Sequence, residues 1–285
     1  MFHLSRLSHP VHSSPHVREV LTPSRMESPE PYQESGVPHA DANVHTTSHQ
    51  TLRVLYCTGN FGKFSEASHV FDEWNASGSF MRVEYSQVDA DPVEIQGDCE
   101  AVGVAKVSAA TRLLIQGYGT ERQAHHDVMM ECSDAGVQCD VVTEDVSLHL
   151  RSLNGFPGPY CKPMLAAIGD DGLWQLVSRY EDKFARVQCT LAAVSVQRNA
   201  DNFSFDDNCI AIHTGVLDGT IGPPKGNVKH GATSWNSVFT PDGHDLTFGE
   251  TPFETQAKFS HRRLAIMRYL ESTQTHMIHE LDHAA

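Results

Sequence analysis

Short apolar runs alternate along the chain with segments of helical periodicity, and this alternation restricts the fold more than any other feature. The apolar run Leu52–Cys57 ends at a glycine-containing turn, which is typical of a buried strand. Residues 63–75 follow with apolar side chains along one side of a helix, and Val83–Val88 has the pattern of a second strand. Strands that alternate with helices in this way favour an α/β domain.

The later elements continue the same alternation. We expect a helix at 98–116 and strands at 139–143, 185–196 and 208–215. Ser260 is a good N-cap residue, and apolar residues recur at helical spacing from there through Leu270. The sequence therefore predicts a last helix that begins at Ser260.

Composition divides the chain into unequal parts. Residues 1–50 are rich in His, Ser and Pro and lack apolar periodicity, so we expect a disordered N-terminal extension. One domain is expected over residues 51–275, with residues 276–285 as a C-terminal tail. Residues 117–138 are polar, glycine-bearing and aperiodic, which indicates a surface insertion within that domain.

The charge balance limits the partners. The formal net charge is -15, whereas a nucleic-acid-binding surface is normally basic, so we expect no nucleic-acid partner. No apolar run is long enough to cross a membrane, and we expect a cytoplasmic protein without a membrane partner. Mitochondria remain the alternative compartment because Arg6, Arg18 and Arg25 accompany a single acid in the first 25 residues, although Pro10 and Pro15 interrupt a long helix.

The first segment whose residues could bind a ligand is Thr58-Gly-Asn-Phe-Gly-Lys63, between the first strand and the first helix. Such a turn presents backbone N–H groups and a helix N-terminus to an anion, and Lys63 adds a positive charge. Taken alone, an ordinary strand-to-helix turn is the more common explanation for such a segment.

The second segment begins with Glu144-Asp145, directly after an apolar run. Adjacent carboxylates at a strand end can bind Mg2+ and orient a water molecule, although a solvated strand end is the more common explanation. The turn Gly155-Phe-Pro-Gly-Pro-Tyr160, with Lys162 just after it, favours a functional role for the acidic pair over a solvated strand end. Two glycines and two prolines in six residues indicate an unusual backbone path, which is costly without a purpose.

The third segment is Ser260-His-Arg-Arg263 at the start of the last helix. His261 and Arg262 can donate hydrogen bonds to a planar, oxygen-bearing ligand. By itself this segment is better explained as a capped surface helix with solvated basic residues.

Taken together and in this order, the three segments resemble the inosine triphosphatase (Ham1-like) family from about Val54 to Leu270. Lesser matches are Glu94-Ile-Gln-Gly97, Lys106, Gly172-Leu173, Pro224-Lys-Gly226 and Phe239-x-Pro-Asp-Gly243. The resemblance implies an α/β fold with an elongated mixed β-sheet flanked by helices, two lobes around a central cleft, and a homodimer. It also implies Mg2+-dependent hydrolysis of ITP, XTP or dITP to the monophosphate and pyrophosphate.

The resemblance further implies three groups of site residues. The triphosphate would be held by Thr58, Gly59, Asn60, Lys63, Lys106 and Lys162. The metal, Mg2+ or Mn2+ in its place, would be held by Glu94, Glu144 and Asp145. The base would be bound by Trp235, Asn236, Gln256, His261 and Arg262. Asp145 would activate the attacking water, with Lys63 and Lys106 as further catalytic groups that compensate the phosphate charge.

Several departures from the family pattern fall near the base. Where the family has Phe-Gly-Trp-Asp-Pro, this chain has Thr-Ser-Trp-Asn-Ser at 233–237, and Gln256 replaces a lysine. Val146 follows the acidic pair, where Thr or Ser is usual. These changes leave open an alternative function, in which a catalytically degenerate member serves as a nucleotide-binding or assembly protein.

One further motif, His279-Glu-Leu-Asp-His283, matches the H-E-x-x-H pattern of zinc peptidases. It ends two residues before the last residue, so no downstream segment can supply a third ligand, while an upstream ligand remains open. Because the chain contains 18 histidines, a chance match is easy, and we do not assign a peptidase on this motif.

Overall fold

The computed structural model describes residues 50–90, 92–117, 127–130, 137–199, 202–226 and 234–284. The expected N-terminal extension therefore lies outside the described residues, except for Gln50, which begins the first strand. Most of the expected insertion at 117–138 lies outside them as well. Within the described part, no helix combines the length and the hydropathy needed to cross a membrane.

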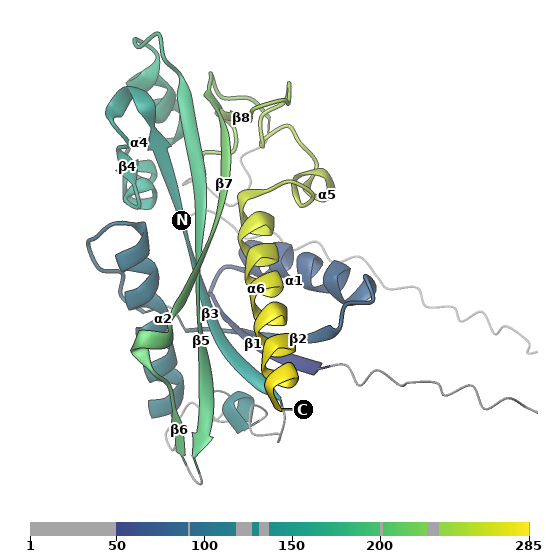
Figure 1. Cartoon of the computed structure of the whole chain (residues 1–285). Coiled ribbons are helices and arrows are strands. Elements are labelled where there is room, and N and C mark those ends of the chain that lie inside the picture. Colours follow the sequence, from purple (N-terminus) through teal and green to yellow (C-terminus); the bar gives the residue numbers. More distant parts are fainter. Residues whose placement is uncertain are drawn as a thin grey trace, which may run out of the picture. The chain divides into compact units, whose positions relative to one another are not determined.

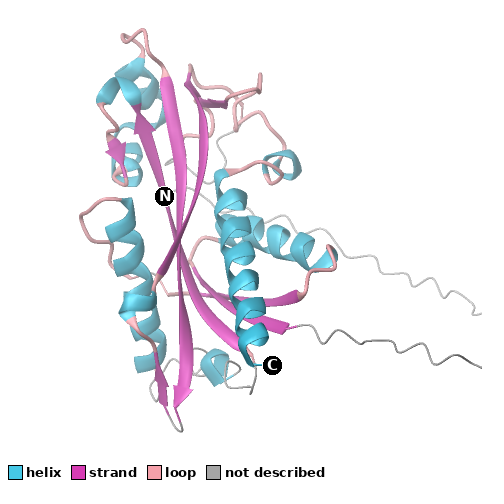
Figure 2. Cartoon of the chain, in the orientation of Figure 1, coloured by secondary structure: helices cyan, strands magenta, loops and turns pink. Residues whose placement is uncertain are grey.

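One mixed β-sheet forms the centre of the described domain (Figures 1 and 2). Its strands are β1 (Gln50–Cys57), β2 (Met81–Val88), β3 (Gln138–Leu150), β4 (Pro157–Gly158), β5 (Phe184–Asn199), β6 (Asn202–Ser204), β7 (Ala211–Ile221) and β8 (Phe239–Pro241). The main path runs β2-β1-β3-β5-β7-β8, while β4 pairs with β3 and β6 with β5. β1 is parallel to both of its neighbours, and every pair beyond β3 is antiparallel.

Helices cover both faces of this sheet. They are α1 (Phe61–Ala76), α2 (Cys99–Gln116), α4 (Cys161–Val177), α5 (Phe253–Gln256) and α6 (His261–Ala284), with short 3-10 turns at Arg151–Leu153 and Asp207–Cys209. Figure 1 shows α1 and α6 on one side of the long strands and α2 and α4 on the other. The predicted class, an α/β fold with a mixed sheet flanked by helices, is confirmed.

The continuous apolar pattern of β1 explains why it is an interior strand of the sheet, between β2 and β3. Leu52, Val54 and Tyr56 pack into the apolar cluster beneath α1 and α6. Leu55 and Cys57 point the other way, into the cluster beneath α2. Successive side chains of a strand face opposite sides, so a continuous apolar run fits a parallel strand that is covered on both faces.

Several predicted elements differ from the structure, among them the strand expected at 208–215, which is β7 at Ala211–Ile221 after the 3-10 turn Asp207–Cys209. The strand expected at 139–143 continues to Leu150, because Leu148 and Leu150 extend the apolar pattern past the two acids into a third cluster that includes α4. The expected C-terminal tail is instead the end of α6, where Met277 is still buried against the main core. Within the expected surface insertion, residues 127–130 are helical, and Met129 is fully buried.

A close approach between α6 and β7 places the start of α6 over the sheet. A Cβ atom on Gly215 would lie 1.9 Å from the backbone oxygen of His261 and 2.5 Å from the Ala265 nitrogen. No side chain fits in that space, so the first turn of α6 packs directly on the backbone of β7. This contact sets the position of His261 and Arg262.

The turn that leads into α4 has the unusual backbone path expected from its glycines and prolines. Asn154, Gly155 and Gly158 have positive φ, and the Phe156–Pro157 peptide bond is cis. Gly158 forms part of β4, which pairs with β3 at Leu148 and His149. The turn thereby delivers the first residues of α4, Cys161 and Lys162, to the sheet near Asp145.

Candidate active site

A pocket of about 370 Å³ gathers nearly all of the predicted site residues. It is lined by Thr58, Gly59, Asn60, Lys63, Glu66, Glu94, Lys106, Asp145, Val146, Cys161, Lys162, Leu165, Ser234, Trp235, Asn236, Phe248, Gln256, Ser260, His261 and Arg262. The first part of this set comes from the β1–α1 turn, α2, β3 and α4, and the second part from residues 234–262. Of the predicted site residues, only Glu144 is not among the lining residues.

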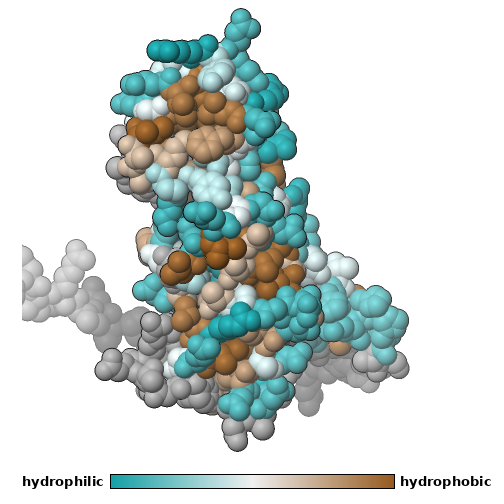
Figure 3. All heavy atoms as spheres, turned by 90° about the vertical axis from the view of Figure 1, so that its left-hand side faces the viewer, coloured by the Kyte–Doolittle hydropathy of each residue, from teal (hydrophilic) through white to brown (hydrophobic). Residues whose placement is uncertain are grey.

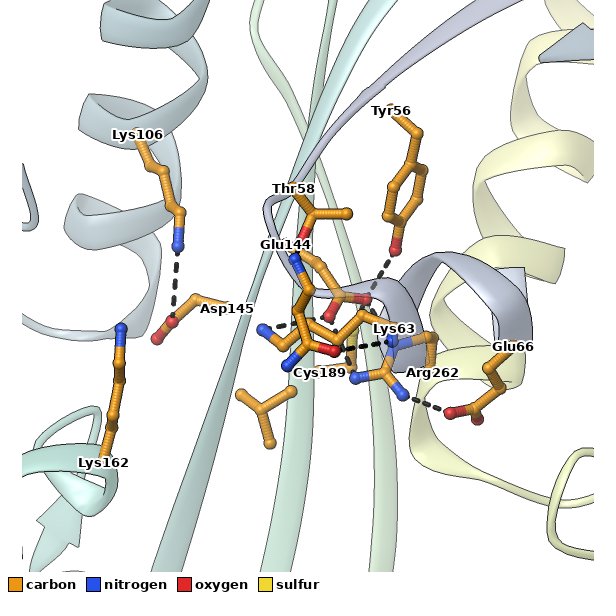
Figure 4. Close-up of polar contacts among 12 residues, drawn as sticks. Tyr56, Thr58, Lys63, Glu66, Lys106, Glu144, Asp145, Lys162, Cys189 and Arg262 are labelled. Carbon is orange, nitrogen blue, oxygen red and sulfur yellow. Dashed lines mark hydrogen bonds and ion pairs between the residues drawn. The ribbon is translucent and has the colours of Figure 1, made fainter. Parts of the chain in front are cut away.

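Glu144 and Asp145 project from opposite faces of β3, as consecutive residues of a strand must. They do not stand at a strand end as the sequence suggested, because β3 continues five residues beyond Asp145. Figure 4 shows Asp145 between Lys106 and Lys162, and Glu144 on the side of Tyr56 and Arg262. The two acids therefore have different surroundings and different chemistry.

Glu144 is the centre of a buried ionic network. Its Oε2 accepts hydrogen bonds from the Tyr56 hydroxyl at 2.6 Å and from Arg262 Nε at 2.6 Å. Its Oε1 accepts from Arg262 Nη2 at 2.9 Å and lies 3.1 Å from Lys63 Nζ. Burial alone would raise the pKa of Glu144, but Arg262 and Lys63 outweigh it and hold that pKa well below its usual range.

This network corrects the predicted metal role of Glu144. Both carboxylate oxygens already accept from protein donors, and the side chain is only 1% exposed. A metal ion would have to displace Arg262 or Lys63 to reach it. We therefore interpret Glu144 as the residue that positions Lys63 and Arg262.

Asp145 faces the pocket with spare acceptor capacity. Its Oδ1 lies 3.9 Å from Lys106 Nζ, and its carboxylate accepts no hydrogen bond from any described residue. Burial raises the pKa of Asp145, and the neighbouring carboxylates of Glu94 and Glu144 add to this effect, whereas Lys106 and Lys63 oppose it. A cationic ligand or a water molecule would relieve this unsatisfied charge.

Glu94 and two lysines complete the acidic end of the pocket. Lys106 Nζ lies 3.2 Å from Glu94 Oε1, and Lys162 Nζ lies 3.6 Å from the same oxygen. Burial raises the pKa of Glu94. Lys106 and Lys162 lower this pKa by more than burial raises it, so the net pKa is below its usual value. Figure 4 shows the two lysines reaching toward Asp145 from opposite sides.

The β1–α1 turn lines the same end of the pocket. Asn60 is the N-cap of α1, and its side-chain oxygen accepts a hydrogen bond from the Lys63 backbone N–H at 3.1 Å. Thr58 Oγ1 accepts from the Asn60 backbone N–H, also at 3.1 Å. The capped helix N-terminus therefore borders the pocket, and the Asn60 amide N–H2 and the Thr58 O–H remain as donors for a ligand.

At the other end of the pocket, His261 lies in an aromatic enclosure. Its ring centroid is 5.5 Å from that of Trp235 and 6.4 Å from that of Phe248. Neither ring nitrogen has a hydrogen-bond partner among the described residues, although the side chain is fully buried. Burial, with Arg262 nearby, lowers the pKa of His261 to about 4, so the ring is neutral at neutral pH. A neutral imidazole can donate from one nitrogen and accept at the other.

The two replaced residues, Asn236 and Gln256, also line this end. The Gln256 amide nitrogen donates to the backbone oxygens of Phe248 and, at 3.0 Å, Thr251. Its remaining polar atom is therefore the acceptor Oε1. The side chain of Asn236 makes no hydrogen bond with the described residues and keeps both its donor and its acceptor. Thr233, the first of the altered residues, lies outside the described residues.

The pocket also contains a residue that the sequence prediction missed. Glu66, on α1, accepts hydrogen bonds from Ser260 Oγ and from Arg262 Nη1. It is 7% exposed, and with Glu144 it holds the Arg262 guanidinium from two sides. Glu66 could have been found from the sequence, because it is an acid on the apolar side of a predicted amphipathic helix. Such a side chain needs a buried partner.

The residues fit a magnesium ion held in part by its substrate. Mg2+ in proteins commonly takes one or two carboxylates and completes its shell with water and substrate phosphates. Glu94 and Asp145 provide two carboxylates beside three lysines that can bind phosphates. Within the described ranges, no group of three or more His, Cys, Asp or Glu side chains could hold a metal ion. A metal that depends on bound phosphate is consistent with this arrangement.

Comparisons with known proteins find similar sequences over most of this chain. A model of the Ham1 family matches residues 54–272. The inosine triphosphate pyrophosphatase of Schizosaccharomyces pombe is 31% identical over 222 residues, which cover 77% of this chain and 95% of that relative. The dITP/XTP pyrophosphatase of Methanopyrus kandleri is 28% identical over 221 residues, again 77% and 95% of the two chains.

Solved structures show the same fold. A HAM1 protein from Coxiella burnetii superimposes with a TM-score of 0.53 at 16% identity, over 80% of this chain and 99% of that chain. The Staphylococcus aureus Ham1 protein gives a TM-score of 0.52 at 18% identity, with the same coverage.

Proposed function

The chain belongs to the Ham1 family, and on this premise we propose that it hydrolyses non-standard purine nucleoside triphosphates such as ITP, XTP and dITP to the monophosphate and pyrophosphate. One observation carries the proposal. A single pocket has a carboxylate with unsatisfied charge, Asp145, among three lysines at one end, and an unpartnered buried imidazole, His261, at the other. The first end suits a triphosphate with a metal ion, and the second suits a base.

At the phosphate end, Lys63, Lys106 and Lys162 compensate the charge of the triphosphate. Glu94 and Asp145 would hold Mg2+, or Mn2+ in its place, which stabilises charge on the phosphate oxygens and the leaving pyrophosphate. Asp145 accepts a proton from the attacking water, and the water oxygen attacks the α-phosphorus. The bond from the α-phosphorus to the bridging oxygen breaks, and pyrophosphate leaves with the electron pair.

At the base end, neutral His261 donates a hydrogen bond to the 6-oxo group of hypoxanthine or xanthine. Gln256 Oε1 accepts the N1–H of the same base, since its amide nitrogen is occupied by backbone oxygens. Adenine has no hydrogen at N1, so Gln256 Oε1 would face a lone pair, and its 6-amino group would require the other tautomer of His261. The rings of Trp235 and Phe248 pack against each other at 5.6 Å between centroids and give the base an apolar wall.

We also propose a homodimer through the face that carries α2 and α4. Figure 3 shows apolar side chains gathered over this side of the molecule. Ile168 and Leu176 of α4 are 42% and 39% exposed, and Phe156 in the preceding turn is 52% exposed. Contiguous exposed apolar surface commonly marks a protein–protein contact. Light scattering should give twice the chain mass, and Ile168→Asp should shift it toward the monomer, whereas a monomeric wild-type protein would refute this assembly.

The test of the proposed activity is a panel of nucleoside triphosphates with purified protein, with and without Mg2+. We expect pyrophosphate release from ITP, XTP and dITP with Mg2+, and much slower release from ATP. Binding of these nucleotides without turnover would favour the degenerate nucleotide-binding alternative. An absence of both binding and turnover would refute the assignment of the pocket.

A further inference from the structure

The exposed end of α6 carries a group of metal-ligating side chains that the pocket does not use. His279, Glu280 and His283 follow His276 at spacings of three, four and seven residues, so all four lie within one stripe of the helix. His276 Nε2 lies 3.2 Å from Glu280 Oε1. His279 Nε2 and His283 Nε2 approach each other to 3.1 Å, with ring centroids 4.3 Å apart.

We propose that His279 and His283 form a binding site for one divalent transition-metal ion. Zinc bonds to imidazole nitrogen at about 2.05 Å, so two nitrogens 3.1 Å apart subtend an angle of roughly 100° at the metal. That angle lies between the octahedral and tetrahedral values. The pair therefore has the ligand separation of a metal chelate already, and binding requires little rearrangement.

The donor set selects the class of metal. Imidazole nitrogen favours Zn2+, Cu2+ and Ni2+, whereas Mg2+ requires oxygen ligands. Each ring is neutral when it binds and keeps its single proton on Nδ1, which leaves the Nε2 lone pair for the metal. A ring that carries its proton on Nε2 in the metal-free chain would pass that proton through solvent to Nδ1 before it binds the metal. Water molecules occupy the other coordination positions, because both side chains are exposed.

The site is distinct from the pocket that binds nucleotide. α6 begins with His261 at the pocket, and His283 lies 22 residues further on, about 33 Å away at the rise of an α-helix. It is also not the centre of a zinc peptidase. Within the described part of the chain, no third ligand joins the histidine pair. Glu280, the general base of that motif, is instead paired with His276 on the exposed helix surface.

The experiment is a Zn2+ titration of the full chain by calorimetry, for wild type and for the double variant L281H/H283L. This exchange keeps the composition and the number of histidines but changes the spacing of the pair from four residues to two, which places the rings on different sides of the helix. Leu281 is 43% exposed, so the exchange disturbs no buried contact. We expect wild type to bind one more Zn2+ than the variant, or to bind that ion at least about tenfold more tightly.

Two further measurements locate the ion. The single variant His276→Gln should keep the additional site, because that histidine pairs with Glu280 and not with the metal. Zn2+ should slow amide hydrogen exchange in the last turn of α6 in wild type and in His276→Gln, but not in L281H/H283L, since a bridge across one helical turn suppresses fraying. Equal Zn2+ stoichiometry and affinity in wild type and L281H/H283L would overturn the proposal, as would equal protection of the last turn.

Discussion

Glu144 and Asp145 are consecutive in the chain, yet the Glu144 carboxylate is saturated by Tyr56, Arg262 and Lys63, while that of Asp145 accepts no hydrogen bond from any described residue. Burial affects both acids, but the net pKa of Glu144 falls and that of Asp145 rises. The same strand thus places a carboxylate held by ion pairs on one face of the sheet and a carboxylate that lines the pocket on the other.

Asp145→Asn should abolish turnover with little effect on folding. The amide cannot take the proton of the attacking water, and a lost general base typically costs about 100-fold or more in rate. Pyrophosphate release from ITP and the urea unfolding midpoint, measured on the same preparation, check this. Retention of near wild-type turnover would show that another group activates the water.

Glu144→Gln should instead destabilise the fold. It leaves the buried Arg262 without its main counter-charge, and breaking a buried ion pair by removal of one partner costs about 3–5 kcal/mol. Denaturant unfolding of Glu144→Gln and Asp145→Asn compares neighbouring positions with the same chemical change. Equal stabilities of the two variants would contradict the assignment of Glu144 as the positioning acid.

Acid should weaken the fold in part through His261. The folded-state pKa of about 4 lies below the ordinary value of 6.5, so between these values the unfolded chain binds the proton more tightly than the folded chain. Stability is therefore complete above pH 6.5 and falls by roughly 3 kcal/mol as the pH drops to 4. His261→Gln should lose this part of the pH dependence. The difference between the unfolding free energies of wild type and variant, measured across that range, isolates the contribution, and an unchanged slope would refute it.

Gly215→Ala should damage stability and activity together. The added methyl group would overlap the His261 backbone oxygen, which forces α6 away from β7 and displaces His261 and Arg262. Overpacking of this kind typically costs about 1–3 kcal/mol. Gly222→Ala is the matched control, because no atom lies within 4 Å of a Cβ atom there. Unfolding midpoints and ITP turnover of the two variants should differ clearly, and equal behaviour would show that the contact is easily relieved.

Much of the fold and of the pocket could be predicted from local sequence patterns. The apolar run of β1, the helix at 98–116 and the Ser260 start of the last helix follow from periodicity and capping, which act between residues close in the chain. That Thr58–Lys63, Glu144–Lys162 and Ser260–Arg262 would meet in one site was predicted from their joint resemblance to the Ham1 family, because each segment alone was ambiguous. The end of β3 was missed because two charged residues resemble a strand end when their partners are unknown.

The sequence by itself determined most of the side chains of the site, with Glu66 as the exception, since charges and donors are properties of the residues. Only the tertiary structure decided which of these side chains contact one another. Lys63 and Glu66 lie on α1, whereas Arg262 lies on α6. The ion pairs of Lys63 and Arg262 with Glu144, and of Arg262 with Glu66, therefore depend on how α1 and α6 pack on the sheet. Strand alternation and the close packing at Gly215 turn adjacent acids to different partners, and such long-range contacts have no signature in local sequence.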